Sequence, residues 1–558
     1  MRSWAPCLIA VKLAFILAFM AITPPSPKDL DTPTDQFSSA RAMEDVRIIA
    51  AKPHPTGSTE NAEVRAYLTT RLKNLGAEVE IETTLLGQRA LARLNKWSGQ
   101  SKTEQEIFNV IGTLPGKDRN KPAVLLMAHH DTVWESPGAA DDTVGIASIL
   151  EIARALKETD SLERDLIMLF TDGEEVGLSG ARYFFSNNPS RDKIGAVINF
   201  EARGGGGTAN MFQTSRGNGP LMRLYAKAVK EPSASSLSAY VYNLLPNDTD
   251  LTPALEKNYA AYNIANLGEA EYYHSPKITA DELDESTLQH MGSQGLDLTR
   301  ALLVAETLPS QTSDATFFDL FGTFTLIYPS ALGWLFLAIT VMCLILSFDR
   351  KSPKSDIVKG ALRMMGMIVL GAASLYILNL MSGSSGANYY DRLAAIPKLE
   401  ILALIACAVL FFIFFGQKRL TTNEYLGAVL PVFILAILAQ FLAPTATYFI
   451  TLPVLFFSFS ALLIRKQPQS GIWVSVIFAA VIFGYMLGLG HLLMLGVGPD
   501  MLSVAILPAI LAALAMLPLY PGLPRETVGY LILIGIILAI ALALWIRLDP
   551  IAITVPTY

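Results

Sequence analysis

The sequence predicts an α/β domain, in which a mainly parallel sheet lies between two helical layers (a three-layer α/β/α fold), followed by an all-α polytopic transmembrane domain. Up to about residue 318, charged and apolar residues are mixed as in a globular domain, whereas long apolar runs follow one another beyond residue 324. In the first part, short apolar runs without alternation flank an amphipathic helical pattern, which is typical of parallel strands covered on both faces. Charged residues make up 16% of the 558 residues, against about 25% in soluble proteins, so much of the chain is suited to lipid.

An apolar run opens the chain, and Arg2 precedes it. We interpret residues 1–23 as an uncleaved signal-anchor helix rather than a cleaved signal peptide, because no clear A-x-A pattern stands before Pro24. The prolines that follow indicate a linker out of the membrane over residues 24–40. The globular domain is then expected over residues 41–310.

Within this domain, strands and helices are expected to alternate. The parallel strands are predicted from three apolar runs, at residues 123–127, 166–171 and 196–200. Between the first two runs, residues 143–157 have apolar side chains at helical spacing, which predicts a right-handed strand–helix–strand crossover. Further helices are expected at residues 62–75, 221–229 and 286–306.

The second part, residues 320–558, is expected to cross the membrane many times. Its apolar runs are long enough to span about 30 Å of hydrocarbon, and they lie near residues 324–348, 360–381, 399–416, 424–442, 446–464, 472–495, 501–520 and 527–546. With the N-terminal helix this gives about nine spans. Basic residues gather in alternate connections, so the positive-inside rule places those connections in the cytoplasm and the globular domain on the opposite side. The expected location is a bacterial inner membrane facing the periplasm, or a vacuolar or endoplasmic reticulum membrane facing the lumen.

Charge and cysteine content exclude several kinds of site. A net charge of −6 argues against a nucleic-acid partner. The three cysteines, Cys7, Cys343 and Cys407, lie within or beside apolar segments, so the globular domain offers neither a disulfide framework nor a cysteine–zinc site. Any metal there has to be held by histidine and carboxylate side chains.

Polar side chains of this kind occur in five short motifs of the globular domain. The candidate residues are His129 in MAHHDT, Asp141 in PGAADDTVG, Glu174 and Glu175 in TDGEEVG, Glu201 in INFEARGG and His274 in EYYHSP. Most of them follow a predicted strand, and ligands of open α/β sheets gather at the carboxyl ends of strands. We therefore expect these motifs to converge on one site.

The residues of each motif are expected to divide their roles. Asp131 lies two residues after His129 and is suited to orient a ligating imidazole. One of Asp141 and Asp142 is expected to cap the helix that follows, and the other to bridge two cations. One glutamate of the Glu174–Glu175 pair is expected to bind metal and the other to act as general base.

Two histidines and three carboxylates can hold two Zn²⁺ ions about 3.5–4 Å apart. Manganese or cobalt would also suit these ligands. The H-E-x-x-H motif of single-zinc proteases is absent from the sequence. Among the other histidines, we interpret His54 as structural and His290 as an exposed helix residue, while His491 is either a polar helix contact or part of an intramembrane path.

In order and spacing, these motifs resemble the di-zinc aminopeptidase and glutamate carboxypeptidase family of co-catalytic metallopeptidases, in particular its multi-pass branch of endoplasmic reticulum and vacuolar membrane metallopeptidases. The resemblance implies specific roles for the matching residues. The implied metal ligands are His129, Asp141 as the bridge, Glu175, Glu201 and His274. It further implies Glu174 as the catalytic base, Asp131 as the residue that orients His129, and Asp250 as a structural aspartate near the site. The tyrosine that assists the oxyanion in some soluble members has no counterpart that the sequence places.

The expected function is that of a membrane-bound zinc-dependent exopeptidase, most consistent with an aminopeptidase that uses two zinc ions. Its expected partners are a peptide substrate and the lipid bilayer, and the oligomeric state stays open. Two alternatives remain at this point. One is a transporter or scaffold with an inactive peptidase-like domain, and the other is a glutaminyl cyclase-like enzyme with one zinc ion.

Overall fold

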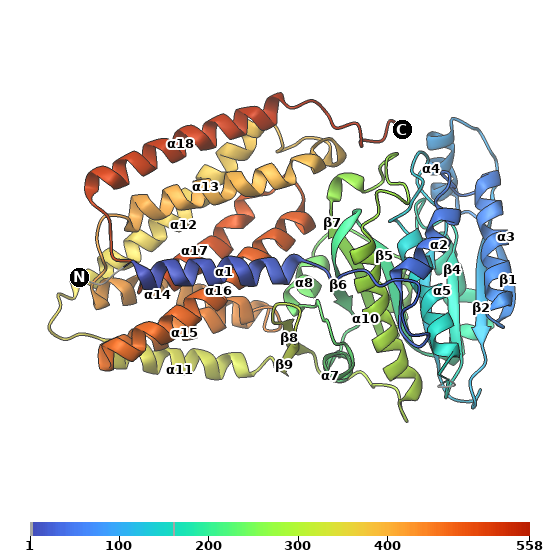
Figure 1. Ribbon diagram of the computed structural model, residues 1–558, viewed down its shortest axis with the longest axis horizontal. Coiled ribbons are helices and arrows are strands. Elements are labelled where there is room, and N and C mark those ends of the chain that lie inside the picture. Colours follow the sequence, from blue (N-terminus) through green and yellow to red (C-terminus); the bar gives the residue numbers. More distant parts are fainter. Residues whose placement is uncertain (1–3, 160–161) are drawn as a thin grey trace. The chain divides into compact units, whose positions relative to one another are not determined.

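Residues 4–159 and 162–558 are described by the computed structural model, so Arg2 at the start of the expected anchor lies outside the described residues. The chain divides into two units, each of which combines segments distant in sequence (Figure 1). The first, here called the helical unit, comprises residues up to Ile22 together with Tyr328–Ala552. The second, called the sheet unit, comprises Thr23–Ile327 together with Ile553–Tyr558.

A seven-stranded mixed sheet forms the centre of the sheet unit. Its strands in spatial order are β1 (Glu78–Leu85), β2 (Glu106–Leu114), β4 (Leu166–Thr171), β3 (Ala123–His129), β5 (Ile194–Ala202), β7 (Ala261–Gly268) and β6 (Gly206–Thr214). The four neighbours β4, β3, β5 and β7 pair in parallel, while β2 and β6 run antiparallel to their partners. The mainly parallel sheet is therefore confirmed, with antiparallel pairing confined to the strands toward its edges.

Helices cover both faces of this sheet, as the three-layer architecture requires. One face packs its apolar side chains against α2 (Ser39–Ile49), α3 (Thr59–Asn74), α5 (Thr143–Lys157), α7 (Gly219–Ala228) and α10 (Glu285–Val304). The opposite face packs against α6 (Ser179–Asn187) and α9 (Leu251–Glu256). The strands β3 and β4 are fully buried from end to end, which explains their uninterrupted apolar sequences.

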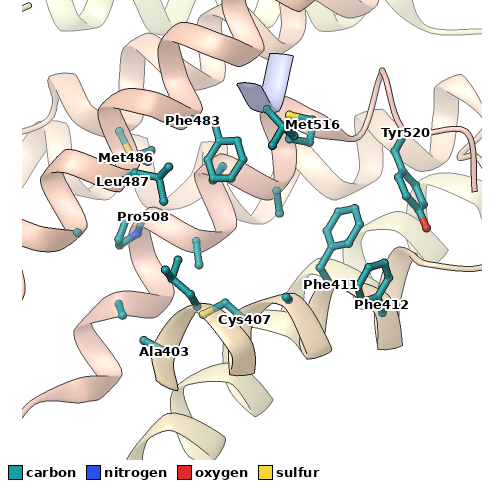
Figure 2. A pocket seen from close by; sticks show the side chains of 18 of the residues that line it. Ala403, Cys407, Phe411, Phe412, Phe483, Met486, Leu487, Pro508, Met516 and Tyr520 are labelled. Carbon is teal, nitrogen blue, oxygen red and sulfur yellow. The ribbon is translucent and has the colours of Figure 1, made fainter. Parts of the chain in front are cut away.

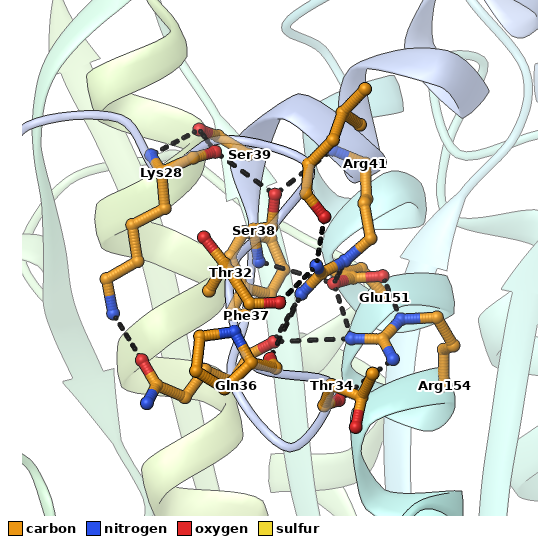
Figure 3. A network of polar contacts seen from close by, with 12 residues as sticks. Lys28, Thr32, Thr34, Gln36, Phe37, Ser38, Ser39, Arg41, Glu151 and Arg154 are labelled. Atoms are coloured by element: carbon orange, nitrogen blue, oxygen red, sulfur yellow. Dashed lines mark hydrogen bonds and ion pairs between the residues drawn. The ribbon is translucent and has the colours of Figure 1, made fainter.

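The end of the expected linker is fastened to the sheet unit by a network of polar contacts (Figure 3). Glu151, a buried residue of α5, accepts hydrogen bonds from Arg41 Nε at 2.8 Å and from Arg154 Nε at 2.6 Å. The two guanidinium groups also donate to backbone carbonyls of the linker, including that of Gln36. Two arginines thus compensate one buried carboxylate and fix the chain ahead of α2, so only the first few residues after α1 remain linker-like.

Within the described part of the helical unit, seven helices are long and apolar enough to cross a membrane. They are α1 (Ala5–Ile22), α12 (Ser355–Ser382), α13 (Ile396–Phe415, preceded by a 3₁₀ segment from Tyr389), α14 (Thr422–Leu442), α15 (Tyr448–Lys466), α16 (Pro468–Val497) and α18 (Arg525–Leu548). Shorter apolar helices, α11 (Leu332–Ser347) and α17 (Ile506–Met516), occupy the other two expected positions. These two are short because β9 (Thr325–Pro329) takes up the start of the first apolar run and a 3₁₀ turn opens the second.

The N-terminal helix α1 packs along α16 (Figure 1). Small residues allow this close approach: a Cβ atom placed on Gly484 would lie 2.8 Å from the Ala14 carbonyl oxygen, and one on Gly488 would lie 3.4 Å from Ala21 Cβ. Helices in lipid associate through such small residues because backbone surfaces can then come into contact. α1 is therefore an integral helix of this unit.

Candidate metal centre

The sheet brings most of the predicted site residues to one edge. His129 is the last residue of β3, Glu174 and Glu175 follow β4, and Glu201 is the penultimate residue of β5. These three strands are parallel neighbours, so their carboxyl ends lie together. His274 arrives after β7, the next parallel strand, and completes the group.

Five side chains form two clusters that share one carboxylate. In the first cluster, His129 Nε2 lies 2.9 Å from Asp141 Oδ1 and 3.7 Å from Glu201 Oε1. In the second, His274 Nε2 lies 3.1 Å from Asp141 Oδ2 and 3.2 Å from Glu175 Oε2. Asp141 thus directs one oxygen to each cluster, which is the arrangement of a bridging ligand.

The neighbouring aspartate, Asp142, has the other role that was open in the sequence. Its Oδ1 accepts a hydrogen bond from the Gly145 amide at 3.2 Å and caps α5, and its Oδ2 accepts one from the His129 amide at 3.3 Å. Capping satisfies an amide at the start of the helix that would otherwise lack a partner. Through these two bonds, Asp142 also fixes the backbone of His129 to the start of α5, directly after Asp141.

Asp131 contacts both His129 and the glutamate pair, but its carboxylate does not orient the imidazole as predicted. The ring nitrogen His129 Nδ1 contacts the backbone carbonyl oxygen of Asp131 at 2.8 Å, while the nearest carboxylate oxygen is 3.8 Å away. The carboxylate instead accepts hydrogen bonds from the amides of Glu174 at 3.0 Å and Glu175 at 3.3 Å, and from Thr56 Oγ1 at 2.9 Å. Asp131 therefore orients the imidazole with its backbone and the glutamate turn with its side chain.

Burial and crowding shift the titration of this site. Burial alone would raise the pKa of Asp141, but the hydrogen bonds to His129 and His274 lower it below its usual range. Burial raises the pKa of Glu201 to about 7, and burial together with the neighbouring carboxylates raises that of Glu174 well above its usual value. Burial would lower the pKa of His129, yet its bonds to Asp141 and Glu201 raise it well above its ordinary value. The pocket therefore favours positive charge among its carboxylates.

The donor set fits divalent cations. Within each cluster the ligand atoms lie within 4.8 Å of one another, and each offers one imidazole and two carboxylates, a combination that suits zinc. Glu175 Oε1 is buried without a hydrogen-bond partner among residues 4–159 and 162–558, as a free ligand atom would be. The two clusters together combine three carboxylates with two imidazoles, and bound cations would compensate the negative charge of the carboxylates.

Two predicted residues lie beside the clusters rather than in them. Glu174 is half-buried, and its carboxylate interacts electrostatically with His129, Glu201 and Glu175. Asp250 accepts a hydrogen bond from the Thr171 hydroxyl at the end of β4, and burial raises its pKa to about 6. Glu174 thus lies beside the two clusters, and Asp250 is bonded to the end of the strand behind them.

Tyr242, which the sequence did not single out, interacts electrostatically with Glu201 and Glu174 of the site. It ends α8 (Ser236–Tyr242), and its ring meets that of Phe212 edge-on at a centroid distance of 4.6 Å. Its hydroxyl is buried and has no hydrogen-bond partner within the described part of the chain. Burial, followed by the charges of Glu201 and of acidic neighbours that include Glu174, raises its pKa. A short helix without motif residues offered no sequence signal for this position.

The remaining histidines of the sheet unit have structural roles. His54 is buried and its Nδ1 contacts the Lys52 carbonyl oxygen at 2.8 Å, in line with the structural interpretation. His290 was expected to be exposed, and this prediction is wrong, because only 3% of its surface is accessible. Its Nδ1 accepts from the Ala209 amide at 3.1 Å, and its Nε2 contacts the Glu231 carbonyl oxygen at 2.9 Å.

Known proteins with similar sequences include membrane peptidases. Residues 109–299 match the sequence profile described as peptidase family M28. The chain is 30% identical over 317 residues to endoplasmic reticulum metallopeptidase 1 of Mus musculus, covering 54% of this chain and 35% of that protein. It is 27% identical over 406 residues to vacuolar membrane protease of Eremothecium gossypii, covering 69% of this chain and 39% of that protein. The match thus spans well under half of the length of these relatives.

Among solved structures, the chain is similar to a Zn-dependent exopeptidase from Parabacteroides distasonis. The two are 20% identical with a TM-score of 0.39, and the match covers 48% of this chain and 99% of the other.

Proposed function

Since the chain contains a domain of peptidase family M28, we propose that it is a membrane-bound zinc-dependent exopeptidase, most specifically an aminopeptidase with two co-catalytic metal ions. The observation that supports this function best is the position of Asp141, whose two oxygens belong to two separate ligand clusters. One cluster alone would suit a single ion. Two clusters joined by one carboxylate suit a pair of ions.

The ligands in this proposal are those of the two clusters. His129 and Glu201 would hold one ion, His274 and Glu175 the other, and Asp141 both. Bound zinc ions supply Lewis acidity that polarises a peptide carbonyl and makes water more acidic.

Two further side chains would act on the reacting atoms. Glu174 is the general base that takes a proton from the attacking water and passes it to the leaving amine, because its carboxylate lies among the ligands without belonging to either cluster. Tyr242 has a buried hydroxyl without a partner among the described residues, and it would donate a hydrogen bond to the oxyanion that develops on the scissile carbonyl.

The preference for a free N-terminus is proposed from the metal ions and carboxylates of the site. Asp141, Glu174, Glu175 and Glu201 outnumber the two imidazoles of the site. A free α-amine could bind one of the metal ions and donate hydrogen bonds to these carboxylates, whereas an acylated amine offers neither interaction. Exopeptidase action at the N-terminus follows from this difference.

The orientation in the membrane is proposed from the connections between the apolar helices. Basic residues stand in the connections near Lys351, Lys418, Arg465 and Arg525, which the positive-inside rule places in the cytoplasm. Residues 553–558, which follow the last apolar helix, belong to the sheet unit, where the Thr557 amide donates to a Glu135 carboxylate oxygen at 2.7 Å. An even number of membrane crossings by the helices between Ile327 and Ile553 would place both parts of the sheet unit on the same side of the membrane. The basic connections assign this side as the periplasmic or luminal one.

The full chain purified in detergent tests the activity. We expect it to hydrolyse aminoacyl-p-nitroanilides, to lose this activity in a chelator, and to regain it with Zn²⁺. N-acetylated versions of the same substrates should not be cleaved. Equal cleavage of acetylated substrates would contradict the exopeptidase assignment, and activity that survives complete metal removal would contradict the metal chemistry.

Metal analysis of the same preparation separates the alternatives. Two zinc ions per chain are expected. One ion per chain, together with cyclisation of a peptide with N-terminal glutamine, would support the glutaminyl cyclase-like alternative. A chain that binds metal but turns over none of these substrates would support an inactive peptidase-like domain beside a transporter or scaffold.

A further inference from the structure

The helical unit contains a cavity of about 640 Å³ whose walls come from segments distant in sequence. α13, α16 and α17 contribute most of the lining, and the N-terminal helix α1 adds Cys7, Leu8 and Val11. Trp4, just ahead of α1, and Met367 of α12 also line the cavity. Figure 2 shows Phe411, Phe412 and Tyr520 gathered toward one end, with Met486, Leu487 and Pro508 away from them. Ligand sites in proteins have volumes of about 300–1,000 Å³, so this cavity is large enough for a small molecule.

Small side chains keep the cavity open. Ala403 and Ala408 of α13 face it, as do Ala509, Ala512 and Ala513 of α17. Protein interiors are otherwise packed as tightly as organic crystals, with few voids larger than a water molecule. The repeated alanines on two facing helices therefore leave room that larger apolar residues would have filled.

Two strongly polar side chains stand among the described residues that line this apolar cavity, and they contact each other. His491 Nδ1 of α16 lies 2.8 Å from Glu400 Oε1 of α13. The two side chains keep 32% and 23% of their surface accessible, so they are not sealed off by neighbouring helices. The other ring nitrogen, Nε2, makes no hydrogen bond to the described residues. Ionisable residues inside a membrane protein are costly and commonly mark functional sites.

The polar pair lies toward one end of an elongated space. The lining of α13 runs from Glu400 to Phe412, a helical rise of about 18 Å. At the Phe412 end, Trp4 meets Tyr520 edge-on at a centroid distance of 5.5 Å, and the Tyr520 hydroxyl donates to the Gly416 carbonyl oxygen at 2.7 Å. That hydroxyl is already bonded, so this end offers apolar ring surface. The cavity is thus polar at one end and apolar along the rest of its length.

We propose that this cavity binds one acyl chain of a lipid-like amphiphile, with the oxygen-bearing polar head hydrogen-bonded to the His491–Glu400 pair and the chain directed toward Phe411, Phe412 and Tyr520. An imidazole whose Nδ1–H is held by a carboxylate presents Nε2 to such a head. This nitrogen accepts a hydrogen bond in the neutral ring and donates one in the imidazolium. An acyl chain fits the elongated apolar part, which a compact polar metabolite would leave unfilled. This binding site is independent of the proposed peptidase activity.

Photolabelling of the full chain in detergent tests the proposal. The probe is palmitic acid with a diazirine near its methyl end, and labelled peptides are mapped by mass spectrometry. We expect the label on the lining segments of α13 and α17 around Phe411 and Met516. Label spread over the outward-facing residues of α18, at the same density as on the lining, would overturn the proposal without the need for any variant.

Matched substitutions sharpen this experiment. Ala512→Phe fills the cavity and should lower labelling of the lining at least tenfold, whereas Ala541→Phe, at an exposed position of α18, should leave it unchanged. His491→Ala should weaken binding of the probe about tenfold, because the head loses its partner. Ala509→Leu fills the cavity less and should also lower labelling of the lining. If both filling variants elute from a size-exclusion column like the unmodified protein and their lining is labelled as strongly, the proposed site is refuted.

Competition by unlabelled lipids identifies the source of the bound acyl chain. Unlabelled palmitate and a phosphatidylcholine with palmitoyl chains are added separately to the labelling reaction. Displacement by palmitate alone indicates a free fatty acid, and displacement by the phospholipid alone indicates a membrane lipid whose chain enters from the bilayer. Displacement by neither compound, at concentrations that saturate the probe, would contradict acyl-chain binding.

Discussion

Replacement of Tyr242 by phenylalanine separates catalysis from stability. The hydroxyl of Tyr242 is buried and makes no hydrogen bond to the described residues, so Tyr242→Phe removes a polar group without breaking a bond. A buried hydroxyl without a partner costs about 1–3 kcal/mol of stability. The variant is therefore expected to unfold at the same temperature as the unmodified protein or slightly above it.

The expected effect on catalysis is opposite and large. A donor that stabilises a developing oxyanion contributes about 10²–10³-fold to kcat. We expect Tyr242→Phe to lower kcat for an aminoacyl-p-nitroanilide by about this factor, with KM and metal content little changed. The measurement is steady-state kinetics of the zinc-loaded full chain, together with thermal unfolding of the same samples.

Tyr225→Phe is the matched control. Its hydroxyl is also buried, but it donates to Gln294 Oε1 at 2.6 Å and accepts from the Ser233 amide at 3.3 Å. Its removal leaves buried partners unsatisfied and should cost about 1–3 kcal/mol, while kcat stays the same. Full kcat in Tyr242→Phe would refute the oxyanion role. A loss of stability equal to that of the control would show that the Tyr242 hydroxyl has a structural partner.

Three further predictions concern the base, a ligand and a buried histidine. Glu174→Gln should retain both zinc ions but lower kcat by at least about 10²-fold, and near-full activity would contradict its role as base. His274→Ala should lower the zinc content from two ions to about one per chain, and unchanged metal analysis would contradict its role as ligand. Burial lowers the pKa of His290 to about 4 in the folded state, against about 6.5 in the unfolded chain. As the pH falls, the unfolded chain binds the proton first, so the free energy of unfolding decreases by about 2 kcal/mol from pH 7 to pH 5. His290→Asn should remove this part of the pH dependence, as measured by hydrogen exchange of α10, and an identical pH dependence in the variant would contradict the assignment.

The central strands could be predicted because their sequences record burial on both faces. β3, β4 and β5 each contain one of the uninterrupted apolar runs, and the structure extends the predicted bounds by a few residues at most. β1 and β2 pair antiparallel toward one edge of the sheet, and β1 alternates between exposed and half-buried positions. β1 (EVEIETTL) therefore resembles a surface loop in composition, so the antiparallel edge of the sheet was not foreseen.

The site was predictable in its residue types, since carboxylates and imidazoles followed buried strands in order. The division of roles between Asp141 and Asp142 depended on backbone geometry, because neighbouring residues of one type give no sequence signal for which one faces the site. His290 was misplaced for a different reason: α10 directs polar side chains inward, where Gln294 donates to the Ala209 carbonyl oxygen and His290 accepts from the Ala209 amide. Helical periodicity alone treats such residues as solvent-facing.

The bonds of Asp131 have a consequence for how variants at this edge of the sheet are interpreted. Its carbonyl oxygen holds His129 at the end of β3, and its carboxylate holds the amides of Glu174 and Glu175 after β4. One residue therefore aligns the proposed metal ligand His129 and the proposed base Glu174, which follow different strands. Any displacement of Asp131 would disturb both alignments simultaneously, so loss of metal and loss of proton transfer would appear as a single inseparable defect.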